Sequence, residues 1–419
     1  MLLTLKNIGK IKEARVELNG ITVITGANDT GKSTVGRTLF CIFNSFYKIN
    51  EQIQKERRNA VRKALDGFIV GLDIEEITDN ILEKAECYNE NPKLLQKYII
   101  GFFLPNYKAV EDYVTEIPFE YITKKVHQII SLSDENIFKT VLSQKLNSEF
   151  NGQINNIYSS NDSGIVKLNI KGNNIEVTIV DNEVKDISKR LSLSTKVIYI
   201  DGSFVLDNIY SSPIIHTRSD NYNKYILHLQ TELMSTKENL GVGDAISKII
   251  LSNKIDNICS KINTICSGQM IKTTSFKLGY QNINSYEVLD IKNISSGLKI
   301  FIIIKTLLLN GSIRDNGIII LDKPEIHLHP EWQILLAQII VLLQKEFNMH
   351  ILLNTYSPYF LRAIQVYSGR CEIADKSKYY LAESIDNKAI LKDVTTSIDE
   401  VYDKFAKPFE SLETERYCY

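Results

Sequence analysis

A glycine-rich segment near the N-terminus constrains the fold more than any other part of the chain. Residues 26–34 read GANDTGKST and fit the pattern G-x-x-x-x-G-K-[ST] in full. The preceding run ITVITG is dense in apolar residues and predicts a buried strand. The following run has apolar residues at helical spacing and no proline, so we expect a helix from Lys32. Strand, glycine loop and helix in this order form a phosphate-binding loop.

The residue types of this loop predict how a nucleotide is held. Glycines let successive backbone N–H groups turn toward phosphate oxygens, and the helix N-terminus adds positive potential. We expect the Lys32 ammonium to reach the β- and γ-phosphates and the Ser33 hydroxyl to coordinate Mg²⁺. The predicted nucleotide-binding residues of the loop are Gly26, Asn28, Gly31, Lys32, Ser33 and Thr34. A glycine loop without a ligand is the alternative, but the predicted strand and helix on either side favour ATP and Mg²⁺.

Two later stretches have the residue types that would complete such a site. In GIIILDKPEIHLHPEW, residues 317–332, an apolar run ends at Asp322, and a buried carboxylate at a strand end can complete the shell of a phosphate-bound Mg²⁺. In NISSGLKIF, Ser295, Ser296 and Gly297 stand at a predicted helix start, where hydroxyls and free N–H groups can bind a γ-phosphate. Ordinary helix capping explains these three residues equally well, and their position before Asp322 is what favours the phosphate-binding role.

Periodicity along the chain predicts an α/β nucleotide-binding head that is split by helical segments. Alternating apolar residues on both sides of KGNN predict a hairpin near residues 166–179, and Gly268 is the expected C-cap of a helix. Two β-like runs are expected around Phe276 and Val288. The expected division is 1–49 for the N-terminal head part, 50–150 for a helical insertion, 151–215 for a β-rich head part, 216–268 for a second helical insertion and 269–419 for the C-terminal head part.

Composition limits the kinds of partner and the cellular location that we expect, but it does not identify a partner. The 49 basic and 50 acidic side chains give a net charge of −1, so a nucleic-acid contact would need a local patch such as Lys55–Lys63, KERRNAVRK. Such a run more often marks a solvated helix face. Six scattered cysteines without a C-x-x-C pair indicate neither a zinc site nor a disulfide framework. No apolar window reaches the ~18 residues of a membrane span, and we expect a cytoplasmic protein.

These motifs together resemble the ABC-type ATPase heads of SMC proteins and of the OLD family. The resemblance rests on the loop at residues 26–34, the Ser-Ser-Gly signature, and the segments LDKPEIHLHP and NTYSPYFL, which cover the two ends of the chain. Bacterial anti-phage systems use such heads, including the ATPase subunits of Septu and PARIS and the ATPase part of Gabija. The resemblance implies an ABC-type P-loop head with helical insertions.

The resemblance also implies a homodimer or a higher homo-oligomer. Two ATP molecules would lie in the interface, each held by residues 26–34 of one subunit and by Ser295, Ser296 and Gly297 of the other. The segment His327–Pro330 matches a part of the family that usually lies at that interface. Its two histidines are not at zinc-site spacing, so packing or interface contacts are the favoured interpretation.

Two residues depart from the family pattern. Lys323 stands where the family has the glutamate that polarises the attacking water, and Tyr356 stands where it has the histidine that contacts the γ-phosphate. A protonated lysine has three donors and no acceptor, so it cannot orient water as a carboxylate does. Lys32 and Asp322 keep their predicted catalytic positions, and Glu325 is a candidate substitute for the water-orienting group. We expect ATP to bind firmly and to be hydrolysed slowly or not at all, unless Lys323 faces solvent and another carboxylate acts.

Two functions are consistent with these expectations. The first is a regulatory ATP-binding subunit that scaffolds and restrains a partner effector, a nuclease or a toxin encoded nearby, in an anti-phage system. The chain itself shows no HNH run and no D-x-D-type acidic cluster. The second is an active DNA-associated ATPase of repair or recombination, for which the run Lys55–Lys63 is the direct support. A transporter ATPase is a distant third.

Overall fold

The computed structural model describes residues 1–66, 74–87, 91–107, 119–159, 162–202, 204–207, 224–235, 245–273, 278–283 and 285–416. The chain forms two compact units. The head unit comprises Met1–Ser45, Ser143–Arg190 and Thr195–Tyr419, and the helical unit comprises Phe46–Leu142 and Leu191–Ser194. The boundaries predicted from the sequence within the head remain a prediction.

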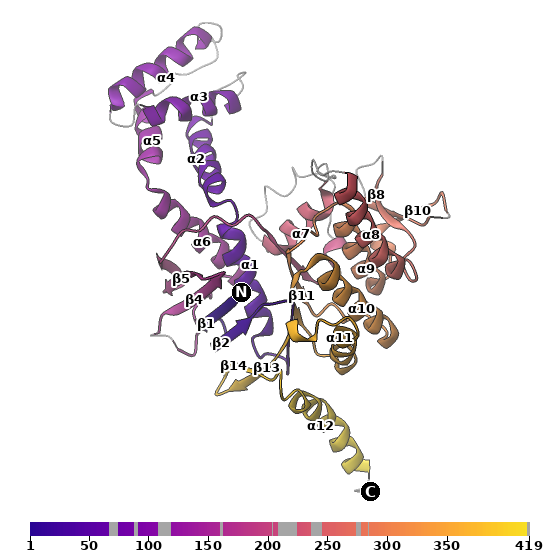
Figure 1. The fold of residues 1–419 in the computed structure, drawn as a ribbon. Helices are drawn as coiled ribbons and strands as arrows, with labels where there is room; N and C mark the ends of the chain where they lie inside the picture. Colours follow the sequence, from indigo (N-terminus) through magenta and orange to yellow (C-terminus); the bar gives the residue numbers. More distant parts are fainter. Residues whose placement is uncertain are drawn as a thin grey trace. The chain divides into compact units, whose positions relative to one another are not determined.

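A large mixed sheet runs through the head unit (Figure 1), with 11 strands among the described residues. Its parallel part contains β13, β3, β12, β11 and β7, while β1, β2, β4, β5 and β6 pair antiparallel. In spatial order the strands are β6 (Glu183–Ile187), β5 (Asn173–Val180), β4 (Gly164–Ile170), β1 (Leu2–Ile8), β2 (Ile11–Glu17), β14 (Lys388–Asp393), β13 (Ser377–Ile385), β3 (Ile21–Gly26), β12 (His350–Asn354), β11 (Ile318–Asp322) and β7 (Val197–Asp201).

The apolar patterns of these strands match their places in the sheet. All five residues of β11 are buried, as expected for a parallel strand that is covered on both faces. In the predicted hairpin of β4 and β5, Val166 pairs with Val177 and both are buried, while neighbouring residues are more exposed. The hairpin and the α/β class predicted from the sequence are thus confirmed.

Helices cover the parallel part of the sheet. The helix α9 is apolar on nearly all sides and lies in the core of the head unit with α10. Figure 1 shows α8 beside both of them. The helices of the head unit are α1 (Lys32–Phe46), the end of α6 (Asp134–Phe150), α7 (Lys224–Met234), α8 (Ala245–Ile262), α9 (Ser296–Leu309), α10 (Pro330–Phe347), α11 (Pro358–Arg370) and α12 (Asp399–Arg416), with short 3-10 turns at Phe204–Leu206, Ile291–Asn293 and Ala374–Lys376.

The role predicted for Gly268 as a helix C-cap is wrong. The helix α8 ends at Ile262, and Gly268 precedes a three-stranded sheet of β8 (Gln269–Lys272), β9 (Leu278–Gln281) and β10 (Val288–Asp290). Its N–H donates to the Tyr280 hydroxyl at 2.8 Å, and a Cβ there would meet the carbonyl oxygen of Gln281 at 2.4 Å. Close approach of β9 therefore requires this glycine. The run predicted near Val288 is β10, and the one near Phe276 lies outside the described residues.

The helical unit buries part of the basic run that suggested a DNA contact. Arg57 is a buried residue of α2 (Ile49–Leu65), and its guanidinium donates to the Leu132 carbonyl at 2.6 Å and to the Asp134 carboxylate at 2.8 Å. Arg58 pairs with Asp79. Both arginines therefore pair with residues of their own unit, Arg57 in a buried position and Arg58 in an exposed one. The unit also includes α3 (Ile74–Cys87), α4 (Pro92–Tyr107), α5 (Phe119–Ser131) and the start of α6.

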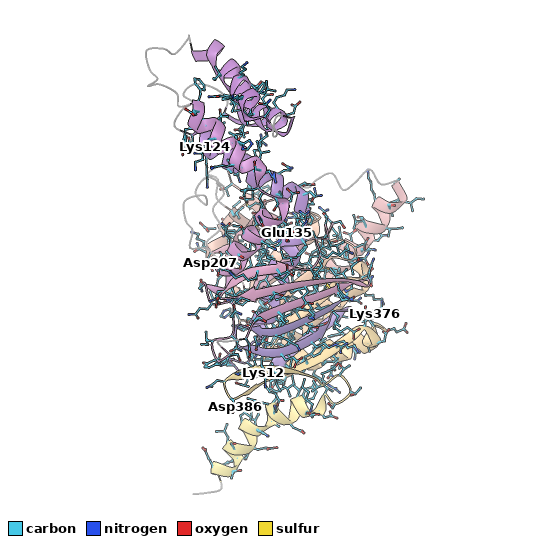
Figure 2. All side chains as sticks on the ribbon, turned by 90° about the vertical axis from the view of Figure 1, so that its left-hand side faces the viewer. Lys12, Lys124, Glu135, Asp207, Lys376 and Asp386 are labelled. Carbon is cyan, nitrogen blue, oxygen red and sulfur yellow. The ribbon has the colours of Figure 1, made fainter. Side chains whose placement is uncertain are left out.

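Charges of both signs are spread over the rest of the surface. Figure 2 shows Lys12, Lys376 and Asp386 at separate places on the head unit. None of the helices in the described part of the chain is long and apolar enough to span a membrane.

Candidate nucleotide-binding site

The glycine loop lies between β3 and α1, as the sequence predicts. Gly26 and Gly31 have φ angles of 136° and 75°, a region that side chains with a Cβ rarely adopt. At Gly26 a Cβ would also meet the carbonyl oxygen of Ala382 in β13 at 2.2 Å. The backbone therefore requires glycine at both positions. The loop that they form leads directly into the N-terminus of α1.

The Lys32 side chain lies inside this loop. It is 2% exposed, and its ammonium donates to the carbonyl oxygens of Gly26 at 3.0 Å and Ala27, and to the Thr30 hydroxyl at 3.1 Å. Burial, and then the charge of Lys323, lowers the pKa of Lys32 to about 8. The charged form of Lys32 is thus disfavoured in the empty loop, and a bound anion would stabilise it. Asn28 is exposed on the loop, and Ser33 and Thr34 are partly exposed in the first turn of α1.

Asp322 is buried at the carboxyl end of β11. Its Oδ2 accepts a hydrogen bond from the Tyr199 hydroxyl at 2.8 Å, and its Oδ1 accepts one from the Asn354 amide at 3.2 Å. Burial, and next the charge of Asp322, raises the pKa of Tyr199 well above its usual range, so the phenol stays a donor. Hydrogen bonds from neutral groups therefore stabilise this buried carboxylate.

Asp201 is a second carboxylate at this edge, and the sequence analysis missed it. It ends β7 and pairs in register with Asp322. Its Oδ2 accepts a hydrogen bond from the Tyr225 hydroxyl at 2.9 Å and lies 3.7 Å from the Arg37 guanidinium. Burial, and then the neighbouring Asp322, raises the pKa of Asp201. A signal was available, because VIYID and IIILD are both apolar runs that end in aspartate.

Lys323 directs its ammonium toward the same region. Its backbone is left-handed, with φ of 54°, and its N–H donates to the Asn354 carbonyl at 2.9 Å. Its Nζ lies 5.8 Å from the centre of the Tyr356 ring, and Lys32 Nζ lies 4.1 Å from the same centre. Lys323 and Tyr356 therefore lie together and beside the loop lysine. The face of an aromatic ring attracts cations at such distances.

Glu325 is held by the loop that follows β12. It is 4% exposed, and its Oε1 accepts hydrogen bonds from the Thr355 hydroxyl at 2.6 Å and from the Tyr356 N–H at 3.0 Å. Its Oε2 is buried without a partner in the described structure, and burial raises the pKa of the carboxyl. This geometry favours a role in positioning Tyr356 over a role in orienting water.

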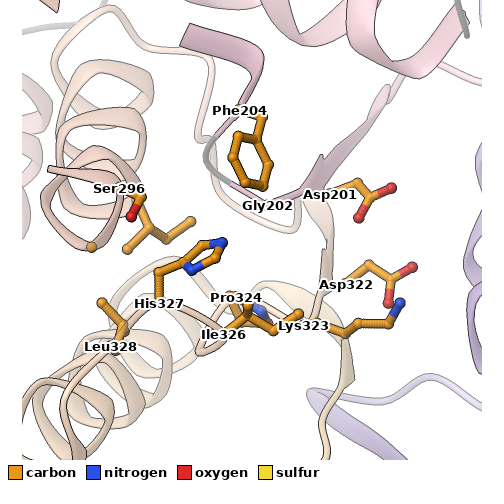
Figure 3. Close-up of a pocket in the computed structure, with 12 residues that line it drawn as sticks. Asp201, Gly202, Phe204, Ser296, Asp322, Lys323, Pro324, Ile326, His327 and Leu328 are labelled. Carbon is orange, nitrogen blue, oxygen red and sulfur yellow. The ribbon is translucent and has the colours of Figure 1, made fainter. Parts of the chain in front are cut away.

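A pocket of about 110 Å³ lies between the end of β11 and the start of α9. Figure 3 shows the carboxylates of Asp201 and Asp322 on one side and Ser296 on the other, with Lys323 along the floor. Gly297 also lines the pocket, and a Cβ there would meet the carbonyl oxygen of His327 at 2.9 Å. The third signature residue, Ser295, is exposed at the N-cap of α9.

The two histidines of HLHP take separate positions near this pocket. The His327 ring lies 5.3 Å from the Phe204 ring, edge to face, and His329 is exposed at the N-cap of α10. No group of three or more His, Cys, Asp and Glu residues in the described part of the chain could hold a metal ion. The ring contact of His327 with Phe204 is consistent with the packing interpretation.

The residues present fit ATP with Mg²⁺. The loop offers N–H groups and Lys32 to phosphates, and Ser33 and Asp322 are oxygen ligands of the kind that Mg²⁺ prefers. The buried Oδ1 of Asn354 and the hydroxyl of Thr25 have no partner within the described structure, so polar acceptors remain for a hydrated ion. When bound, Mg²⁺ would offset phosphate charge, while the chain's own residues bind the nucleotide.

Comparison with known families agrees with this geometry. The AAA ATPase domain family matches residues 1–361. The chain belongs to this family. The expected ATPase relationship is thereby confirmed at the level of the AAA ATPase domain, and membership implies nucleotide binding. No curated protein matches the chain.

Three solved structures are similar in outline to this AAA ATPase chain. An SMC head bound to the C-winged helix domain of ScpA shares 12% identity and a TM-score of 0.42, covering 94% of this chain and 96% of the other. For the SMC head domain from Thermotoga maritima the values are 9%, 0.39, 94% and 98%. For an SMC head with an extended coiled coil, bound to the C-terminal domain of ScpA derived from Pyrococcus furiosus, they are 12%, 0.38, 98% and 98%.

The lowered pKa of Lys32 predicts how nucleotide affinity depends on pH. A bound phosphate stabilises the ammonium and raises this pKa from about 8, so binding takes up protons near and above pH 8. Affinity for a non-hydrolysable ATP analogue should be nearly constant below pH 8 and should fall as pH rises to about 9.5. Calorimetry in buffers of different ionisation enthalpy measures both the affinity and the proton uptake.

Lys32→Arg is the matched control, because arginine stays protonated over this range. This variant should bind with no proton uptake from its side chain. An affinity of the unmodified protein that does not change between pH 7 and 9.5 would contradict the prediction.

Proposed function

We propose that this AAA ATPase domain protein binds ATP firmly and hydrolyses it slowly or not at all, acting as an ATP-held switch. One observation carries the proposal. Lys323 and Tyr356 lie together beside Lys32. They stand at the two positions where the ABC-type heads that the motifs resemble have a glutamate and a histidine. Both substitutions affect groups that act on water or on the γ-phosphate, and the loop and Asp322 keep the residues needed for binding.

The surrounding carboxylates do not readily replace the missing glutamate. Glu325 uses one oxygen to hold Thr355 and Tyr356, and Asp322 accepts hydrogen bonds on both oxygens. Asp201 is pinned through Oδ2 by Tyr225 and faces the charge of Lys323. A positioned general base often contributes 10²–10⁴-fold to a rate, so its loss supports slow hydrolysis.

Substitution of the two departing residues tests the proposal. Lys323→Glu with Tyr356→His should raise the rate of phosphate release about 10²-fold or more over the unmodified protein. A coupled phosphate assay measures the rate, with Lys32→Ala as the background. The proposal fails if the unmodified protein already turns over at about 1 s⁻¹ or faster, in the typical range of enzymes, and loses this activity in Lys32→Ala.

The assembly proposed for the switch is a homodimer or larger homo-oligomer that holds ATP between copies. Exposed Ser295 and pocket-lining Ser296 and Gly297 would meet the nucleotide of the partner copy. Two exposed apolar side chains at the pocket, Phe204 and Ile326, support an interface there, because apolar groups are buried when copies associate. The biological role we propose is restraint of a partner effector, a nuclease or a toxin encoded nearby, in anti-phage defence, which the motif resemblance supports.

Light scattering after gel filtration tests this assembly. With ATP, the protein should elute at twice the monomer mass or more, together with the co-expressed product of the neighbouring gene. Ser295→Arg should shift it to the monomer mass, while Ser252→Arg, a change at an exposed residue of α8, should not. A monomer with ATP, or an assembly indifferent to Ser295→Arg, contradicts the proposed interface, and separate elution of the neighbouring product contradicts the proposed partner.

The DNA-associated ATPase is not favoured by a comparable observation. Two of the three arginines in the run Lys55–Lys63, Arg57 and Arg58, form ion pairs with Asp134 and Asp79 of the same unit. Neutral pairs of this kind leave little positive charge for phosphates. Lys55, Arg62 and Lys63 of the same run are exposed, so the support that this run gives to a DNA role is reduced.

A further inference from the structure

The Lys323 ammonium has no hydrogen bond or ion pair with any residue that the structure describes. Two other lysines that are buried in the head unit, Lys299 and Lys305, form ion pairs or hydrogen bonds with neighbouring residues. Lys299 pairs with Asp207. Lys305 donates to the Asn263 side chain and to the backbone carbonyls of the segment between α8 and β8. A partly buried charge without a partner is costly unless a ligand supplies one. The Lys323 ammonium is therefore available to an anionic ligand at this place.

The position of this ammonium is set by the backbone. The left-handed turn at Lys323 and its N–H bond to the Asn354 carbonyl fix the direction in which the side chain leaves the strand. The side chain lines the same pocket as Asp322 and Asp201. Its charge acts on Lys32 and on Asp201, so it belongs to the electrostatics of the loop that receives the phosphates.

Asp322 does not need a cation to be stable in this structure. The Tyr199 hydroxyl and the Asn354 amide donate to its two oxygens, so its charge is stabilised by fixed dipoles. A divalent cation at Asp322 would also meet the charge of Lys323. Repulsion between cations weakens the advantage that Mg²⁺ has in a site with a glutamate at this position.

We propose that Lys323 makes ATP binding largely independent of Mg²⁺, because its ammonium supplies beside the phosphates the positive charge that the metal would otherwise provide. The proposal rests on the proposed function, since it concerns the same site. Ser33 and Asp322 remain the ligands of Mg²⁺ when the ion is present. The ligand class that the site accepts thus includes the metal-free nucleoside triphosphate.

Calorimetric titration with a non-hydrolysable ATP analogue, in excess EDTA and in excess MgCl₂, tests the proposal on the full chain. The unmodified protein should bind with dissociation constants that agree within about threefold in the two solutions. In Lys323→Glu, EDTA should raise the dissociation constant at least about tenfold. In Lys323→Met, EDTA should also weaken binding more than in the unmodified protein.

Lys12→Met is the matched control, since it removes the same charge from an exposed position on β2 (Figure 2) and should behave as the unmodified protein. Thermal melting of each variant checks that it is folded. The proposal is overturned if EDTA weakens binding by the unmodified protein tenfold or more, or if Lys323→Met responds to EDTA as the unmodified protein does. Fast phosphate release would refute only the slow hydrolysis, whereas absence of binding in both solutions would refute ATP binding itself.

Discussion

The parallel pairing of β3, β12, β11 and β7 is the constraint on which the rest of the site depends. Carboxyl ends of parallel strands meet at one edge of a sheet, and ligands of open α/β sheets bind outside that edge. Because β12 lies between β3 and β11, Asn354 pairs in register with both Ile24 and Asp322. The glycine loop and the buried aspartate, which are far apart in sequence, are thereby held at one place.

The same pairing forces an unusual electrostatic arrangement. Two aspartates and two lysines gather at this edge, and buried charges need partners or hydrogen bonds. Asp322 is satisfied by a phenol and an amide, and Asp201 by Tyr225 and Arg37. Lys32 donates to acceptors of its own loop, while the Lys323 ammonium has no hydrogen-bond partner among the residues that the structure describes. A glutamate at position 323 would change this balance by two charges, which is why one residue carries so much of the functional proposal.

The sequence predicted the elements whose signals are local. The loop at residues 26–34, the strand ending at Asp322 and the hairpin of β4 and β5 all follow from residue types and spacing within a few positions. Asp201 was missed because only the order of the strands in the sheet shows that it lies next to Asp322. The C-cap prediction for Gly268 was wrong because the apolar spacing of α8 continues past the end of the helix. The close approach of β9 is what requires glycine at this position.

Side-chain pairing was also beyond the sequence. The basic run on α2 gave no sign that Arg57 would be buried against Asp134, since the partner comes from α6. Likewise the contact of Lys32 and Lys323 with one tyrosine ring depends on β12 lying between β3 and β11. The sequence identified Lys323 and Tyr356 separately, and only the fold brings them together.

An experimental structure of the protein prepared with ATP itself, without an analogue, tests the central claim most directly. The density at residues 26–34 decides whether the γ-phosphate is still attached, and the position of Lys323 shows what it contacts. The account predicts intact ATP with the Lys323 ammonium at hydrogen-bond distance from a phosphate oxygen. Bound ADP, or a Lys323 side chain turned away from the nucleotide, would contradict it.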